Sequence, residues 1–129
     1  MYADNESDSG QPGIPYRLKQ YIDVIVQPSL TFTYSPEKGY TGLVTGRPMM
    51  LLLARGGVYR SGNPLETFDF QETYLRCIFG FIGFTDIRAV TIQGTLQNTA
   101  EQGEADMRAA TAAAQDAAHE FAGELALQV

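Results

Sequence analysis

The feature that most constrains the fold is an uninterrupted apolar run over residues 49–54, Met-Met-Leu-Leu-Leu-Ala. A half-exposed strand alternates apolar and polar residues, whereas a run without alternation predicts burial on both faces. A central strand of a parallel sheet, with helices above and below, has that environment. A short buried helix is the alternative, because Met and Leu also favour helices. The abrupt stop at Arg55-Gly56-Gly57 favours the strand.

Apolar residues recur at helical spacing on both sides of this run, and a second run rich in β-branched residues follows it. The alternation of helices and strands predicts an α/β fold. In chain order the sequence predicts a helix from Ile14 that Pro28 ends, an extended piece at 31–34, a turn-rich segment with Gly39, Gly42 and Gly46, a strand at 48–54, a helix at 70–81 that ends at Gly80 or Gly83, a strand at 86–93 and an Ala-rich helix at 99–126.

Composition excludes several classes of function. The net charge is −6 and the nine basic residues are scattered, which argues against a surface for nucleic acid or anionic membrane. One cysteine allows no internal disulfide and fits a reducing cytoplasm. One Cys and one His offer no metal site, and no apolar run reaches membrane length. A length of 129 residues suits one domain, with the polar residues 1–13 as a disordered or looping lead-in.

Five short stretches, in the same order, resemble FMN-dependent NADH-azoreductases of the flavodoxin-like NAD(P)H quinone reductase family. The similarity spans residues 13 to about 95, and each stretch is weak by itself. The stretches are Gly13-Ile14-Pro15, Thr31-Phe32-Thr33-Tyr34, Gly42-Leu43-Val44-Thr45-Gly46-Arg47, Arg55-Gly56-Gly57-Val58-Tyr59 and Gly80-Phe81-Ile82-Gly83-Phe84-Thr85-Asp86.

The resemblance implies a doubly wound parallel sheet of strand order 2-1-3-4-5, with flavin at the carboxyl ends of the strands. Residues 14–129 align with its C-terminal half: strands 4 and 5 with helices 3, 4 and 5. The serine-rich loop that grips the FMN phosphate in the family has no counterpart in this sequence. Met1-Tyr2 is either a remnant of a flavin-contacting motif or a coincidence.

The resemblance also implies hydride transfer from NADH or NADPH to FMN, and then to a quinone or azo compound. Ala54-Arg55-Gly56-Gly57 aligns with the family's ring-binding Ser-Arg-Gly-Gly, and Ala54 lacks the hydroxyl of the usual serine. Glycines suit a flat ring that approaches bare backbone N–H groups. By spacing alone, these glycines are only a loop after a strand.

Three aromatic residues are the substrate-binding candidates that the resemblance implies: Tyr34, Tyr59 and Phe81. Aromatic faces stack on planar acceptors such as quinones. In the family, the residue aligned with Phe81 reaches the site across a homodimer interface. The alternative for Phe81 is the core face of its own helix.

Other polar and reactive residues are assigned no catalytic role. Lys19 and Asp23 predict an ion pair on a solvated helix face. Cys77 is predicted to be a small core residue, and His119 lies among alanines.

By the resemblance, the predicted function is an FMN-dependent oxidoreductase, and the alternative is a non-catalytic truncated or degenerate fragment able at most to dimerise. Strand 48–54 has only strand 86–93 as a neighbour, which predicts self-association, a cover formed by residues 1–13, or marginal stability.

Overall fold

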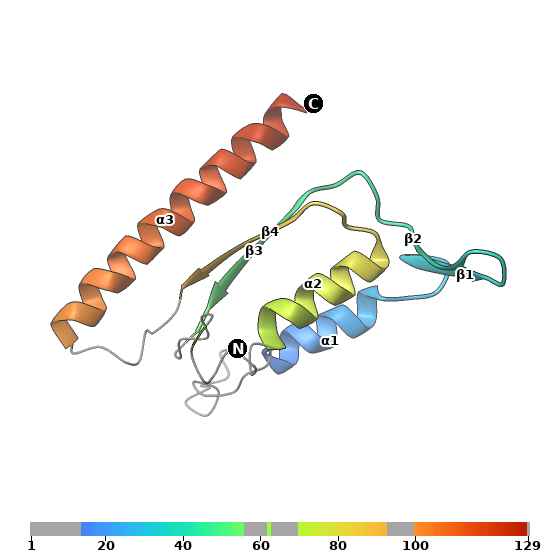
Figure 1. Ribbon diagram of the computed structural model, residues 1–129, viewed down its shortest axis with the longest axis horizontal. Helices are drawn as coiled ribbons and strands as arrows, with labels where there is room; N and C mark the ends of the chain where they lie inside the picture. Colours follow the sequence, from blue (N-terminus) through green and yellow to red (C-terminus); the bar gives the residue numbers. More distant parts are fainter. Residues whose placement is uncertain (1–13, 56–61, 63–69, 93–99, 129) are drawn as a thin grey trace. The chain divides into compact units, whose positions relative to one another are not determined.

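A computed structural model describes residues 14–55, 62, 70–92 and 100–128 (Figure 1). The chain divides into two compact units. The helix–hairpin unit comprises described residues 14–49 and 70–88, and the strand–helix unit comprises the remaining described residues. The elements in chain order are α1 (Tyr16–Ile25), β1 (Phe32–Ser35), β2 (Gly39–Gly42), β3 (Met49–Ala54), α2 (Phe70–Ile82), β4 (Ile87–Ile92) and α3 (Ala100–Leu127).

The apolar run forms strand β3, so the predicted strand is confirmed and the buried-helix alternative is wrong. β3 pairs with β4. The Met49 N–H donates to the Asp86 carbonyl at 2.8 Å, and the Arg55 N–H donates to the Ile92 carbonyl at 2.8 Å. Both bonds join residues 37 positions apart, so the strands run parallel, as the arrows in Figure 1 show. Parallel strands need a long crossover, and α2 lies within it.

The two faces of β3 differ in exposure. Leu51 and Leu53 are 9% and 7% exposed, whereas Leu52 between them is 57% exposed. The predicted burial on both faces is therefore wrong for Leu52, because the side chains of a strand alternate and the described residues cover only one face. β4 is the neighbour of β3 among the described strands, so the predicted unpaired edge is confirmed within that part of the chain. The predicted cover by residues 1–13 lies outside the described residues.

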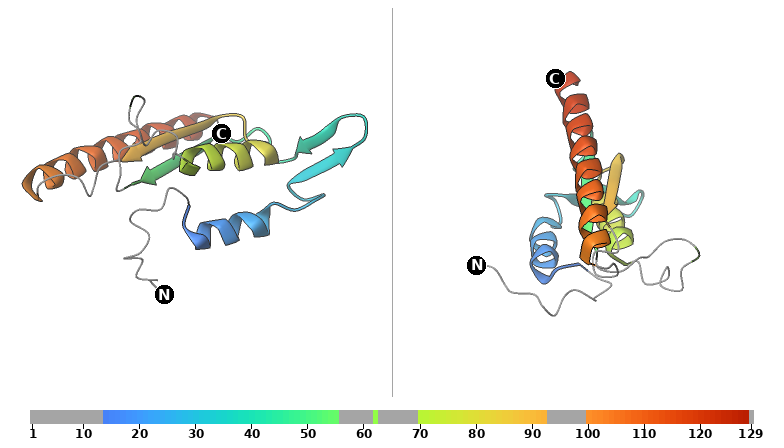
Figure 2. Two further views of the ribbon diagram at one scale, coloured as in Figure 1. Left: turned by 60° about the horizontal axis from the view of Figure 1, so that its bottom comes forward. Right: turned by 90° about the vertical axis from the view of Figure 1, so that its left-hand side faces the viewer.

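Strands β1 and β2 form an antiparallel hairpin in the helix–hairpin unit (Figure 2). Tyr34 pairs with Tyr40, and Phe32 pairs with Gly42. The sequence predicts the extended piece at β1 but only turns at 39–42. β2 forms there because β1 supplies hydrogen-bonding partners. The local sequence of a glycine-rich segment does not predict that pairing. The core of this unit consists of Ile22 from α1 and, from α2, Leu75, Phe79 and Ile82.

The end of α2 meets the segment after β2 through bare backbone. A Cβ built on Gly42 would lie 2.4 Å from the backbone nitrogen of Gly83, and one built on Gly83 would lie 2.8 Å from the Val44 carbonyl oxygen. Gly83 also has a φ of +123°, which L side chains rarely adopt. The Val44 N–H donates to the Ile82 carbonyl at 2.8 Å. Gly83, and not Gly80, therefore follows the end of the predicted helix.

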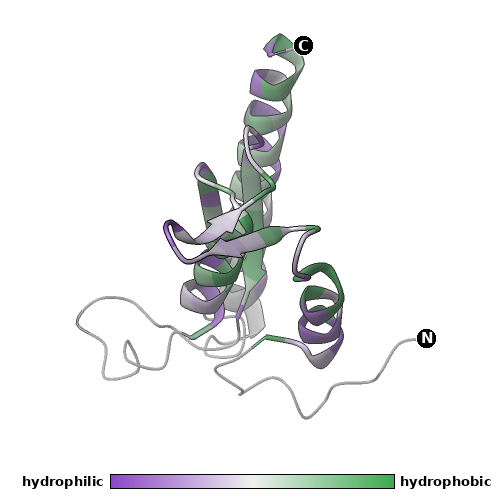
Figure 3. Cartoon of the chain, turned by 90° about the vertical axis from the view of Figure 1, so that its right-hand side faces the viewer, coloured by the Kyte–Doolittle hydropathy of each residue, from purple (hydrophilic) through white to green (hydrophobic). Residues whose placement is uncertain are grey.

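The last helix, α3, has 28 residues and a weak apolar stripe. Five members of the predicted stripe are half-buried, and the sixth, Met107, is 47% exposed. Hydrophilic residues interrupt the apolar ones along the helix (Figure 3). Among the described residues, no helix combines the length and the apolarity needed to cross a membrane. The half-buried members are Ala110, Ala114, Ala117, Phe121 and Leu125.

The glycine contact predicts opposite effects of two alanine substitutions. Gly42→Ala should lower the free energy of unfolding by about 1–3 kcal/mol, because its methyl group would overlap backbone that cannot rotate away. Gly80→Ala should raise it by about 0.5–1 kcal/mol, because Gly80 lies inside α2 and its added methyl group would enter open space. Urea unfolding followed by circular dichroism measures both changes. Equal effects of the two variants would contradict the close approach.

Candidate functional site

Two of the four predicted flavin-ring residues lie at the carboxyl end of β3. Ala54 is the last residue of the strand and is exposed. Arg55 follows it and is 8% exposed. Its backbone N–H continues the sheet by donating to the Ile92 carbonyl, so this N–H is already engaged. Gly56 and Gly57 lie outside the described residues.

Four aromatic side chains, here called the aromatic cluster, gather where the hairpin meets α2. Tyr34 and Tyr40 have ring centroids 5.0 Å apart, Tyr40 and Phe81 5.5 Å, and Phe32 and Phe81 4.8 Å. Each pair is tilted by 53°, a geometry in the favourable range for aromatic pairs. Tyr34 and Tyr40 are 61% and 65% exposed, so the cluster offers open ring surface.

The hairpin register explains why these rings meet. Phe32 and Tyr34 are two residues apart on β1 and therefore share one face of the hairpin. Tyr40 lies directly opposite Tyr34, and Gly42 lies opposite Phe32. Because Gly42 has no side chain, the end of α2 can approach the hairpin and bring Phe81 against Phe32 and Tyr40.

Two of the three predicted substrate-binding residues, Tyr34 and Phe81, belong to this cluster and are linked through Tyr40. Tyr59 lies outside the described residues. Phe81 is half-buried beside the hairpin rings, whereas the buried side chains of α2 are Leu75, Phe79 and Ile82. The role of these residues stays a prediction.

Sequence reasoning missed Tyr40, because the turn-rich segment was not predicted to contain a strand. Its register opposite Tyr34 is set by pairing with β1. An aromatic residue between glycines, soon after an aromatic strand, is the signal that could have drawn attention to it.

The remaining residue predictions have mixed outcomes. The predicted ion pair between Lys19 and Asp23 is confirmed on α1. The prediction that Cys77 is a core residue is wrong, because its thiol-bearing side chain is exposed. Cys77 lies two residues after buried Leu75, and an offset of two residues points to the other side of a helix. His119 is exposed on α3. In the described residues, no group of three His, Cys, Asp or Glu side chains could hold a metal ion.

Comparison with known proteins gives close curated relatives. The chain is 52% identical over 108 residues to an FMN-dependent NADH:quinone oxidoreductase of Nitratidesulfovibrio vulgaris, covering 84% of this chain and 51% of that protein. It is 48% identical over 89 residues to a protein of the same name from Desulfotalea psychrophila, covering 69% of this chain and 42% of that protein. The chain thus spans about half the length of the curated relatives it matches.

Solved structures and a protein family also match the chain, and they are of the same kind as these relatives. An azoreductase from Bacillus anthracis str. Sterne superposes with a TM-score of 0.75 at 34% identity, covering 85% of this chain and 51% of that one. An FMN-dependent NADH-azoreductase from Bacillus anthracis str. Ames Ancestor, in complex with FMN, gives 0.72 at 30% identity, covering 85% and 50%. The family described as Flavodoxin-like fold matches residues 12–118. This chain, with its parallel β3–β4 pair, therefore belongs to the flavodoxin-like fold family.

Proposed function

We propose that this chain supplies the flavin-ring and acceptor side of an FMN-dependent oxidoreductase, which passes electrons from NADH or NADPH to a quinone or azo compound. The proposal rests mainly on the 52% identity, over 84% of the chain, with a protein named an FMN-dependent NADH:quinone oxidoreductase. The position of Ala54 and Arg55 supports the proposal, since ligands of open α/β sheets bind beyond the carboxyl ends of the strands.

The residues at the end of β3 would each contribute differently to the binding of a flat ring. Ala54 is small and exposed, and it leaves the end of the strand uncrowded. The Arg55 N–H is engaged in the sheet, and the resemblance makes Gly56 and Gly57 the proposed backbone donors to a ring. Bound FMN would supply the two-electron redox chemistry. Backbone N–H groups beside it would stabilise negative charge on the reduced ring.

The aromatic cluster is the proposed acceptor surface. The exposed rings of Tyr34 and Tyr40 offer faces for a planar quinone or azo compound, and the Phe81 ring packs against the Tyr40 ring. Tyr59 joins this set by resemblance. By the resemblance, Phe81 also reaches the site of a second copy, so the proposed working form is a homodimer. The single cysteine supports a cytoplasmic location for the protein.

A second candidate is a chain that dimerises without catalysis. The exposed Leu52 and the single described neighbour of β3 favour it, because both leave apolar strand surface for another chain. The two candidates differ in whether the 129 residues retain a flavin-ring site, which flavin titration measures directly.

Flavins with and without phosphate should bind the chain alike. None of the 129 residues aligns with the family's phosphate loop, so only the ring should be held. FMN and riboflavin should therefore both bind weakly, with dissociation constants within about tenfold, or about 1.4 kcal/mol. Isothermal titration measures both constants. Binding of FMN about 100-fold tighter than that of riboflavin would reveal a phosphate site and contradict the expectation, and no binding of either would favour the non-catalytic candidate.

Substitution of the glycines should weaken the ring contact. Gly56→Val should reduce riboflavin affinity by at least about tenfold, because a branched Cβ would intrude where the ring meets the backbone. His119→Ala is the matched control, since His119 is exposed on α3 and has no proposed role. Flavin fluorescence titration compares the variants. The ring assignment fails if both retain the parent affinity.

If the aromatic cluster binds the electron acceptor, changes in it should alter the KM for a quinone but not the KM for NADH. In the flavin-loaded protein, Tyr34→Ala or Tyr40→Ala should raise the KM for a quinone by about 2- to 10-fold, which corresponds to one aromatic contact, and should leave the KM for NADH unchanged. Tyr16→Ala serves as control, because Tyr16 is 73% exposed on α1, outside the aromatic cluster. Steady-state kinetics provide the test. An equal rise for Tyr16→Ala would argue against a specific acceptor surface.

A further inference from the structure

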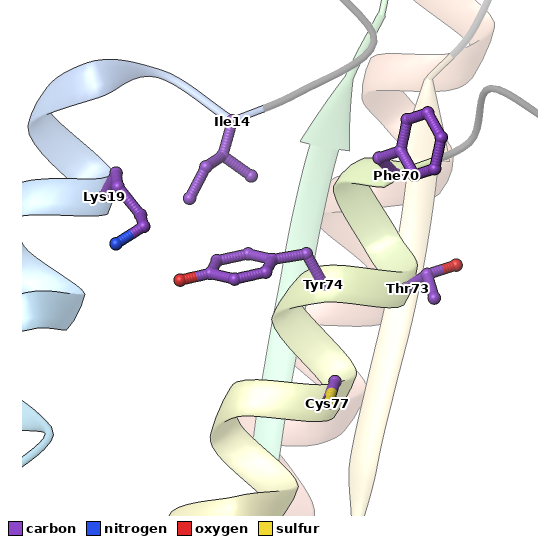
Figure 4. A pocket seen from close by; sticks show the side chains of 6 residues that line it. All are labelled: Ile14, Lys19, Phe70, Thr73, Tyr74 and Cys77. Carbon is purple, nitrogen blue, oxygen red and sulfur yellow. The ribbon is translucent and has the colours of Figure 1, made fainter.

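A cavity of about 470 Å³ lies in the helix–hairpin unit, between the N-terminal part of α1 and the first two turns of α2 (Figure 4). Its volume falls in the range of pockets that bind small organic molecules. The surface that lines it is almost entirely apolar. The lining residues are Ile14, Lys19, Phe70, Thr73, Tyr74 and Cys77.

The apolar wall decides which chemical group the cavity can hold. The Tyr74 ring extends from α2 towards α1 in Figure 4. Lys19 pairs its ammonium with Asp23, so its methylene chain is the part left for the wall. An apolar wall gives a polar or charged group no partner in place of water, and burial without a partner is unfavourable. The cavity therefore suits a hydrocarbon group.

The apolar face of α2 continues beyond the cavity. Phe70, Tyr74, Cys77 and Phe81 follow one another at spacings of four, three and four residues. Residues three or four apart are neighbours on one side of a helix, so these four side chains form a continuous stripe, here called the α2 stripe. The first three line the cavity, and Phe81 belongs to the aromatic cluster. The α2 stripe thus joins the cavity to the proposed acceptor surface over about 16 Å.

The α2 stripe is additional to the core face of the helix. A helix at the surface of a protein needs one apolar stripe to pack on the core, and α2 has it at Leu75, Phe79 and Ile82. In the α2 stripe, by contrast, Phe70 is 54% exposed and Cys77 is exposed. A second, exposed apolar face that runs into a cavity is typical of a binding surface.

We propose that the acceptor is a quinone with an apolar side chain, with its ring on the aromatic cluster and its side chain along the α2 stripe into the cavity. The open rings of the cluster suit the planar head, and the concave apolar cavity suits an alkyl or isoprenoid chain. This inference rests on the proposed function, because the head occupies the proposed acceptor surface. It selects one class among the quinones and azo compounds named there.

Two quinones with the same ring test the proposal. Decylubiquinone carries a decyl chain, and ubiquinone-0 has a hydrogen in its place. Decylubiquinone should bind the whole chain at least about tenfold more tightly, because each buried methylene group adds about fourfold. Amide chemical shifts measure both affinities and locate both molecules. Tyr40 and Phe81 should shift with either quinone, whereas Thr73 and Cys77 should shift with decylubiquinone alone.

A variant of the cavity wall should affect only the quinone with the chain. Phe70→Ala should weaken the binding of decylubiquinone by about 2- to 10-fold, because the chain loses apolar contact area, and should leave the binding of ubiquinone-0 unchanged. Tyr21→Ala is the matched control, because Tyr21 is 59% exposed on α1 and lies outside the cavity lining. Thermal melts of both variants establish that the fold is retained.

Three results would overturn the proposal. Equal affinities for the two quinones would exclude a site for the chain. Unchanged shifts of Thr73 and Cys77 on addition of decylubiquinone would show that its chain lies elsewhere, as would equal effects of Phe70→Ala and Tyr21→Ala.

Turnover with NADH in the flavin-saturated chain separates this inference from the proposed function. Reduction of both quinones with the same KM would contradict the site for the chain and leave the oxidoreductase function in place. Binding of decylubiquinone in the cavity without reduction of either quinone would support the site and contradict the proposed function.

Discussion

The approach of two glycines, Gly42 and Gly83, is the constraint on which the helix–hairpin unit depends. A Cβ on Gly42 would overlap the backbone of Gly83, and a Cβ on Gly83 would overlap the backbone of Val44. The hydrogen bond from the Val44 N–H to the Ile82 carbonyl fixes the same junction. A two-stranded hairpin is marginal by itself in water. Docking on the end of α2 provides the tertiary support that it needs, and the same docking brings Phe81 to the aromatic face of the hairpin.

Helix α2 serves two chemically different surfaces. Phe81, in its last turn, contributes to the aromatic cluster, whereas Phe70 and Tyr74, in its first turns, line the cavity beside α1. Phe70 and Phe81 are separated by about 16 Å along the helix axis, at about 1.5 Å per residue. One surface is open and built of exposed rings, and the other is concave and lined by apolar surface.

At the end of β3, the sheet itself limits which residues can bind a ligand. The Arg55 N–H is committed to Ile92 of β4, so the strand pair extends one residue past the apolar run. The Arg55 N–H is therefore not available to a ligand at this end of the strand. The exposed Leu52 shows a second consequence of a two-stranded sheet, because one face of β3 is left open among the described residues.

The sequence by itself determined the helices, the strands other than 39–42 and the resemblance to the family, which implied that 48–54 and 86–93 are neighbouring parallel strands. These follow from residue periods and local motifs, which report what each segment can form. The tertiary structure decided that 39–42 is a strand, that Tyr40 links Tyr34 to Phe81, that Leu52 is exposed, and that Cys77 lines a cavity. Each of these depends on a partner distant in the chain. A period shows that a residue is apolar, but only packing determines which neighbour, or solvent, that residue meets.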